Sequence, residues 1–199
     1  ALPILDDLQC AFSTLKGFLA GEKKRYGAVY CVLDNEEVGS GTRQGAASTF
    51  LKDVLMRISF SQGGGMEDYL RRIAASFLVS ADNAHAVHPN YGEKADPVNR
   101  PYLNGGIVLK YSANQKYCTD GLSAAVFKDV CREAGVPFQV FTNRSDLPGG
   151  STLGNISTSQ VAVSAVDIGL PQLAMHSPYE TAGTMDTVYL SRAAKKYFE

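Results

Sequence analysis

The sequence predicts an α/β fold in which helices are layered on a sheet. Short apolar runs rich in β-branched and aromatic residues alternate with segments whose apolar residues recur at helical spacing. This alternation continues to a last helical segment at residues 184–198, and no internal repeat or low-complexity tract interrupts it. A layered sheet is the architecture that buries both kinds of element in one core.

Composition narrows the class of protein. The chain has 199 residues, 45% of them hydrophobic and 20% charged, which fits one globular domain or part of a larger one. A net charge of −1 without blocks of like charge argues against a nucleic-acid-binding protein. No apolar run approaches the roughly 20 residues needed to cross a bilayer, and no signal peptide is recognisable. The four cysteines are scattered, so the expected location is the reducing cytoplasm and no membrane partner is expected.

The first part of the chain predicts a helix, a strand and two further helices. The first helix begins at Asp6 or Asp7 and ends near Gly21. Residues 26–33 are apolar and predict a buried strand. A helix around residues 47–58 and another at 67–75 then lead into a short strand at 76–80. The apolar face expected for the first helix consists of Leu8, Ala11, Phe12, Leu15, Phe18 and Leu19.

The second part continues the alternation. Strands are expected at residues 106–111 and 136–141, on either side of a helix that follows Asp120 and ends near Gly135. Residues 143–154 are rich in Gly, Ser and Asp and predict a loop. Two short strands at 161–166 and 170–175 precede the closing helix. The face expected for the helix after Asp120 consists of Leu122, Ala125, Val126 and Val130.

Side chains that can bind metals recur where apolar segments end. They are Asp6, the pair Glu36 and Glu37, Asp82, and His176. Such an oxygen-rich set with an imidazole suits zinc, manganese or cobalt, and two such metals can activate a water molecule. Taken singly, these residues have ordinary explanations, because aspartates cap helices and a Glu-Glu pair is commonly a solvated turn.

Several segments together resemble the aspartyl aminopeptidases, the M18 metallopeptidases. Residues 34–40 are similar to the acidic motif of that family, residues 5–8 to its bridging-aspartate segment, residues 80–90 to a long and specific motif, and residues 174–177 to its final ligand segment. The resemblance runs from Leu5 to the C-terminus. It implies a three-layer α/β/α zinc-peptidase-like mixed sheet.

The resemblance also implies a role for each matching residue. Asp6 would bridge two divalent metal ions, zinc in the first instance with manganese or cobalt as alternatives. Asp82 would bind the first metal, and Glu37 with His176 the second. Glu36 would be the general base. The residues implied to contact the substrate are Lys110, Asp146, Gly150 and Ser151.

The resemblance is incomplete at the N-terminus. The family's first histidine ligand has no match, because every histidine follows the acidic motif, and a β-rich dimerisation domain is absent. Residues 1–199 are therefore expected to form a single domain, the C-terminal part of a catalytic domain, with a weakened site at Asp82 and low activity alone. Its expected partners are peptide substrates and either a homo-oligomer or a complementing N-terminal segment.

Two other interpretations remain open at this point. One is a non-catalytic assembly subunit that keeps the fold, which the missing histidine favours. The other is a metal-dependent hydrolase of related fold that acts on acyl-amino acids, which the motif at residues 80–90 disfavours.

Overall fold

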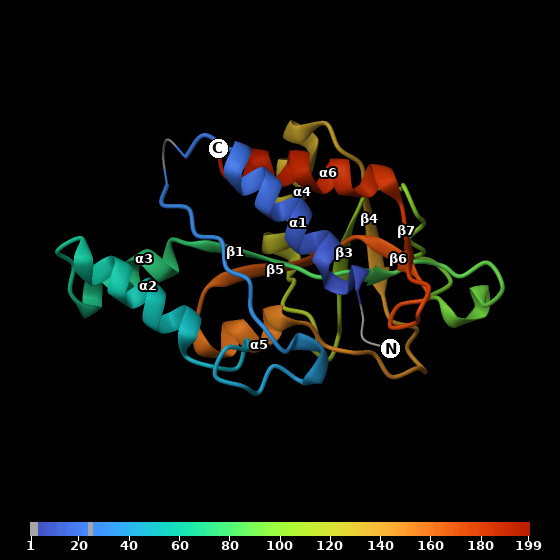
Figure 1. The fold of residues 1–199 in the computed structure, drawn as a ribbon, viewed down its shortest axis with the longest axis horizontal. Helices are drawn as coiled ribbons and strands as arrows, with labels where there is room; N and C mark the ends of the chain where they lie inside the picture. The colour runs from blue at the N-terminus through green and yellow to red at the C-terminus, as the bar shows by residue number, and fades with distance from the viewer. Residues whose placement is uncertain (1–3, 24–25) are drawn as a thin grey trace.

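Helices cover both faces of a mixed β-sheet in the computed structural model, which describes residues 4–23 and 26–199 (Figure 1). The main sheet has the order β1-β5-β3-β4, in which β5 runs parallel to β1 and antiparallel to β3, and β3 runs parallel to β4. Its strands are β1 (Phe77–Ala81), β3 (Ile107–Tyr111), β4 (Phe138–Thr142) and β5 (Ser164–Gly169). A small second sheet joins β2 (Ala84–His85), β6 (Pro171–Leu173) and β7 (Thr181–Ala182).

The helices divide between the two faces of the main sheet. Three of them lie together on one face, α5 lies on the other, and α2 and α3 form a pair at one end of the molecule (Figure 1). The first three are α1 (Leu5–Ala20), α4 (Gly121–Ala134) and α6 (Thr184–Tyr197). The others are α2 (Phe50–Ser61), α3 (Met66–Ala74) and α5 (Leu153–Gln160), with 3-10 turns η1 (Glu36–Val38) and η2 (Gly92–Lys94).

The main core lies between the sheet and the three-helix face. Ile107 and Leu109 of β3 and Ile168 of β5 are fully or almost fully buried there, against Phe127 of α4 and Leu190 of α6. Because β3 lies inside the sheet and is covered on both faces, its first four residues are all buried. This rigid strand also carries Lys110 into the candidate site described below.

The packing of α1 on α6 corrects the predicted helix face. Leu8 and Leu19 are 62% and 71% exposed, whereas the buried positions of α1 include Cys10, Ser13 and Gly17. A Cβ atom at Gly17 would lie 2.4 Å from the Cβ of Ala194, so only glycine allows this approach. The helix pair therefore approaches closely through its small residues. Leu8, Phe12 and Leu19 point outward, while half-buried Phe18 packs against Phe198 at the end of α6.

The face predicted for the helix after Asp120 is correct only at Val130, which is half-buried and packs against the core. In α4 the buried residues are Ser123, Ala124, Phe127 and Cys131, while Leu122 is 70% exposed. Phe127 dominates the contact because it brings the largest apolar side chain into the core. The boundaries of α4 agree with the prediction, since Asp120 accepts a hydrogen bond from the Ser123 amide and Gly135 ends the helix at φ 63°.

The strand predicted at residues 26–33 is absent. None of the described strands includes these residues, and they alternate between exposed and half-buried positions. A strand needs a hydrogen-bonding neighbour, and none of the described strands supplies one here.

Two differences occur near residue 160. Residues 153–160 form α5, which the sequence did not predict, and the strand expected at 161–166 lies at Ser164–Gly169 instead. The later position places Asp167 inside the sheet, with its side chain fully buried. Among the described helices, none is long and apolar enough to cross a membrane.

Candidate metal centre

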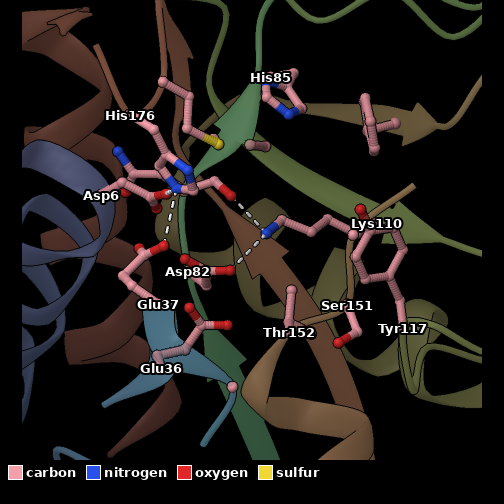
Figure 2. Close-up of a pocket in the computed structure, with 16 residues that line it drawn as sticks. Asp6, Glu36, Glu37, Asp82, His85, Lys110, Tyr117, Ser151, Thr152 and His176 are labelled. Carbon is pink, nitrogen blue, oxygen red and sulfur yellow. Dashed lines mark hydrogen bonds and ion pairs between the residues drawn. The ribbon is translucent and has the colours of Figure 1, made fainter. Parts of the chain in front are cut away.

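A cavity of about 290 Å³ opens where several ligand-bearing segments meet. The N-terminal turn of α1, the η1 turn, the end of β1, β3, and the loops at residues 150–152 and 175–176 each contribute to its wall. Figure 2 shows acidic side chains and His176 on one side of this cavity and Lys110, Tyr117 and Ser151 on the other.

Asp6 lies at the inner end of the cavity. Asp6 and Asp7 depart from helical backbone angles, and the N-cap of α1 is Ile4, which makes no side-chain cap. The Asp6 side chain is therefore free to point into the cavity, where its Oδ2 lies 2.9 Å from His176 Nε2. Its Oδ1 is buried and has no hydrogen-bond partner in the described part of the chain. The helix-capping explanation thus fails for Asp6.

Glu36 and Glu37 enter from η1 with different surroundings. Glu37 Oε2 lies 2.9 Å from His176 Nε2, so Glu37 shares this ring nitrogen with Asp6. Glu36 also lines the cavity (Figure 2). The backbone makes the turn possible because Asn35 and Gly39, which flank η1, both take positive φ angles. Two adjacent carboxylates are therefore held in one cavity rather than spread over a solvated loop.

Electrostatics in the cavity favour a positive charge. Burial, with the nearby carboxylate of Asp82, raises the pKa of Asp6 to about 9. Burial, with the charges of Asp82 and Glu37, raises the pKa of Glu36 to about 7. Carboxylates crowded into a low-dielectric site resist ionisation together, and a cation would relieve this repulsion.

The donor set fits a divalent cation. One ligand atom from each of Asp6, Glu37 and His176 lies within 4.8 Å of the others, and these are oxygen and imidazole ligands suited to zinc or manganese. The orphaned Oδ1 of Asp6 is the atom that would gain most, because a buried acceptor without a partner is costly.

Asp82 and Lys110 form a buried ion pair beside this group. Lys110 Nζ lies 3.3 Å from Asp82 Oδ2 and 2.5 Å from the carbonyl oxygen of Asn83 (Figure 2). Burial is the largest single effect and would lower the pKa of Lys110, but the charge of Asp82, together with Tyr117 and Asp167, outweighs burial and raises this pKa. Lys110 is therefore charged and lies at the cavity wall, with its ammonium already paired.

The predicted substrate-contact residues separate into two groups. Gly150 and Ser151 line the cavity, together with Thr152. Asp146 does not line it, because its exposed carboxylate pairs with Arg144, at 2.7 Å from Nε. The structure thus brings the end of this loop to the cavity and leaves its start outside.

The chain as a whole matches a known family. The model of the aminopeptidase I zinc metalloprotease (M18) family matches residues 1–198. The chain belongs to the M18 family. This confirms the resemblance seen in the sequence, and the family description implies a divalent metal.

Similar proteins agree with this assignment. The probable M18 family aminopeptidase 2 of Clostridium acetobutylicum is 48% identical over 194 residues, which are 98% of this chain and 45% of that protein. A chain in the cryo-EM structure of the Ape4 and Nbr1 complex matches with a TM-score of 0.91 and 37% identity, covering 99% of this chain and 38% of that one. The mApe1 dodecamer of S. cerevisiae matches with a TM-score of 0.83 and 28% identity, over 99% and 45%.

These matches confirm the layered α/β fold of the M18 chain. They also show that the chain spans less than half the length of these relatives.

Sequence reasoning missed two carboxylates that hold the segments lining the cavity by hydrogen bonds. Asp167 accepts hydrogen bonds from the Cys118 amide (2.6 Å) and from Thr152 Oγ1 (2.9 Å), and so holds the loop that carries Ser151. Glu180 accepts hydrogen bonds from backbone amides on both sides of the Asp6–His176 contact. A charged residue within an apolar strand was the available signal for Asp167, and a carboxylate four residues after His176 was the signal for Glu180.

Proposed function

We propose that this chain is the C-terminal part of the catalytic domain of a metal-dependent aminopeptidase. It would hydrolyse the N-terminal peptide bond of peptides and prefer substrates that begin with Asp or Glu. The observation that carries the proposal is the convergence of Asp6, Glu37 and His176 in one cavity, with Glu36 beside them.

The proposed ligand sets follow the residues of the cavity. Asp6 would bridge two divalent ions, zinc first and manganese or cobalt as alternatives, Glu37 with His176 would bind one, and Asp82 would bind the other. Bound cations would polarise the substrate carbonyl and make the attacking water more acidic. Fewer ligand groups surround Asp82 than surround the group of Asp6, Glu37 and His176. This supports weaker metal binding at Asp82 in this chain.

Glu36 is proposed as the general base. Its side chain faces the cavity, and its raised pKa of about 7 suits a group that accepts a proton from water and returns it to the leaving amine near neutral pH. Glu37 cannot share this role equally, because its carboxylate already contacts His176.

Lys110 is proposed as the source of the acidic preference. Its ammonium is the charge in the cavity wall that attracts a carboxylate, and Asp82 is its present partner. Asp82 would help to hold a cation, and Lys110 would contact the side chain of a substrate Asp or Glu. Gly150 and Ser151, which also line the cavity, would contact the substrate too, with Ser151 on the same side as Lys110 (Figure 2).

We also propose a location and an assembly for this chain. All four cysteines are free, which supports a reducing compartment such as the cytoplasm. The exposed apolar side chains of α1, together with the dodecameric state named for the S. cerevisiae neighbour, support self-association. Sedimentation of the chain over a range of concentrations tests this. A monomer throughout would favour a complementing N-terminal segment as the partner.

One experiment tests the activity. Bound metal per chain and hydrolysis of an aspartyl peptide are measured for the wild type and for Glu36→Gln, each alone and mixed with the unmatched part of the Clostridium acetobutylicum relative. We expect hydrolysis in the wild-type mixture and its loss in Glu36→Gln, with the metal content unchanged. Metal binding without hydrolysis in every wild-type sample would instead favour the assembly-subunit interpretation, and hydrolysis unaffected by Glu36→Gln would reject the assigned base.

A further inference from the structure

Glu180 lies four residues after His176, and its carboxylate accepts hydrogen bonds from several segments around the candidate metal site. We infer that Glu180 is a positioning residue that holds Asp6 and His176 at the separation a shared cation requires. The inference rests on the proposed metal site, but it concerns a residue that touches neither substrate nor metal.

The first contact of Glu180 is with the segment that carries Asp6. Glu180 Oε2 accepts hydrogen bonds from the backbone amides of Ile4 (2.9 Å) and Leu5 (2.6 Å). These amides lie at the start of α1, where helical partners are missing by geometry. The carboxylate therefore fixes the backbone directly before Asp6, where the chain departs from regular helix.

The second contact is with the segment that carries His176. The other oxygen, Oε1, accepts a hydrogen bond from the His176 backbone amide at 2.8 Å. His176 has a φ angle of 64°, which a residue with a side chain rarely adopts. A hydrogen bond to its amide helps to hold this backbone and so directs the imidazole at Asp6 and Glu37.

Glu180 also connects to the buried residue next to Asp82. Gln172 Nε2 donates to Glu180 Oε1 at 3.3 Å, and Gln172 Oε1 accepts from Asn83 Nδ2 at 2.5 Å. Asn83 in turn contacts Gln9 and Cys10 of α1. One polar network thus links the three chain segments that bear Asp6, Asp82 and His176.

A carboxylate is the chemical group that this position needs. The hydrogen bonds to Glu180 described above all come from N–H donors. An ionised carboxylate is acceptor-only, whereas a glutamine would present an NH₂ group to some of those donors. The hydrogen bonds lower the pKa of Glu180 against the opposing effect of its burial, which agrees with an ionised acceptor.

The test is a cobalt titration of the metal-free chain, read by the visible absorption of bound Co²⁺. It compares the wild type, Glu180→Gln, and the control Glu67→Gln, which makes the same chemical change at an exposed position on α3. We expect Glu180→Gln to bind Co²⁺ about 10–100-fold more weakly, as is typical for residues that orient ligands. The control should bind as the wild type does, and circular dichroism should show all three chains folded.

Wild-type Co²⁺ affinity in Glu180→Gln overturns the inference. If the metal-free variant then also unfolds at a lower temperature than the wild type, Glu180 has a role in stability alone. Should Glu180→Gln fail to fold, amide hydrogen exchange of the wild type decides. Slow exchange of the Leu5 and His176 amides supports the positioning role of Glu180, and exchange at the rate of exposed amides rejects this role.

The positioning role of Glu180 and the proposed aminopeptidase function can fail independently of each other. A wild-type chain that binds Co²⁺ but hydrolyses no peptide, even when mixed with the unmatched part of the Clostridium acetobutylicum relative, defeats the aminopeptidase proposal and leaves the Glu180 comparison valid. Peptide hydrolysis by the wild type, together with unchanged Co²⁺ affinity in Glu180→Gln, defeats only the positioning role.

Discussion

The close contact of α1 with α6 predicts that Gly17→Ala destabilises the chain. The new Cβ would lie 2.4 Å from Ala194 Cβ and 2.6 Å from the backbone nitrogen of Lys195. Ordinary contacts between such atoms are about 3.5–4.0 Å, so the two helices must separate by about 1 Å. Because backbone atoms form part of the contact, a side-chain rotation cannot relieve it.

The magnitude follows from two opposing effects. Overpacking of this kind costs about 3 kcal/mol at the upper end of its usual range. The better helix propensity of alanine returns about 1 kcal/mol. The net loss is about 2 kcal/mol, which corresponds to a fall of about 4–8 °C in the unfolding temperature for a chain of this size.

The assay is urea or thermal unfolding of the metal-free chain, with Gly121→Ala as the control. Gly121 lies in the first turn of α4, and a Cβ there would meet nothing within 4 Å. The control should therefore be as stable as the wild type or slightly more stable. Equal stability of Gly17→Ala and Gly121→Ala would refute the reasoning, because it would mean that α1 and α6 adjust without cost.

Four further outcomes are expected. Glu36→Gln should lower kcat for an aspartyl peptide about 10²–10⁴-fold without reducing bound metal, which metal analysis of the same samples checks. Because the folded-state pKa of Asp6 is raised to about 9 from 3.8, the folded metal-free chain holds this proton more tightly than the unfolded chain. The stabilisation that comes from the protonated Asp6 is therefore full below pH 3.8 and is lost as the pH rises through about 9. The urea midpoint of unfolding should fall between pH 6 and pH 8. The fall should be smaller in Asp6→Asn. Lys110→Met removes one partner of a buried ion pair and should destabilise the metal-free chain by about 3–5 kcal/mol; a smaller loss in urea unfolding would mean that the Asp82 charge is well solvated. Adding Zn²⁺ at 100 times its Kd should stabilise the chain by about 2.7 kcal/mol, and a chelator should reverse the shift seen in thermal unfolding.

The sequence predicts the order of most helices and strands because their signals are local. Asp120 and Gly135 mark the two ends of α4, and Gly21 ends α1. Which helix face is buried depends instead on the partner helix. Gly17 is buried because Ala194 is small enough to meet it, and no periodicity of apolar residues reveals that choice.

The candidate site could be assembled from the sequence only in part. Asp6, Glu37, Asp82 and His176 were singled out because each follows or begins an apolar segment, and the structure gathers them around one cavity. Their assignment as ligands remains a prediction. The strand at residues 26–33 could not be judged from its own residues, because pairing depends on a neighbour elsewhere. Asp146 was named because its loop resembles a family segment, and such a resemblance does not tell which end of the loop faces inward.

The contact between Asp6 and His176 has a consequence for biosynthesis. These two residues are 170 positions apart in the chain, and Glu180, which contacts both of their segments, comes later still. A ribosome-bound chain therefore cannot close this site until almost all of the described sequence has emerged. Metal capture at the proposed site would thus be one of the last events in the maturation of this chain, and premature release would leave Asp6 without His176.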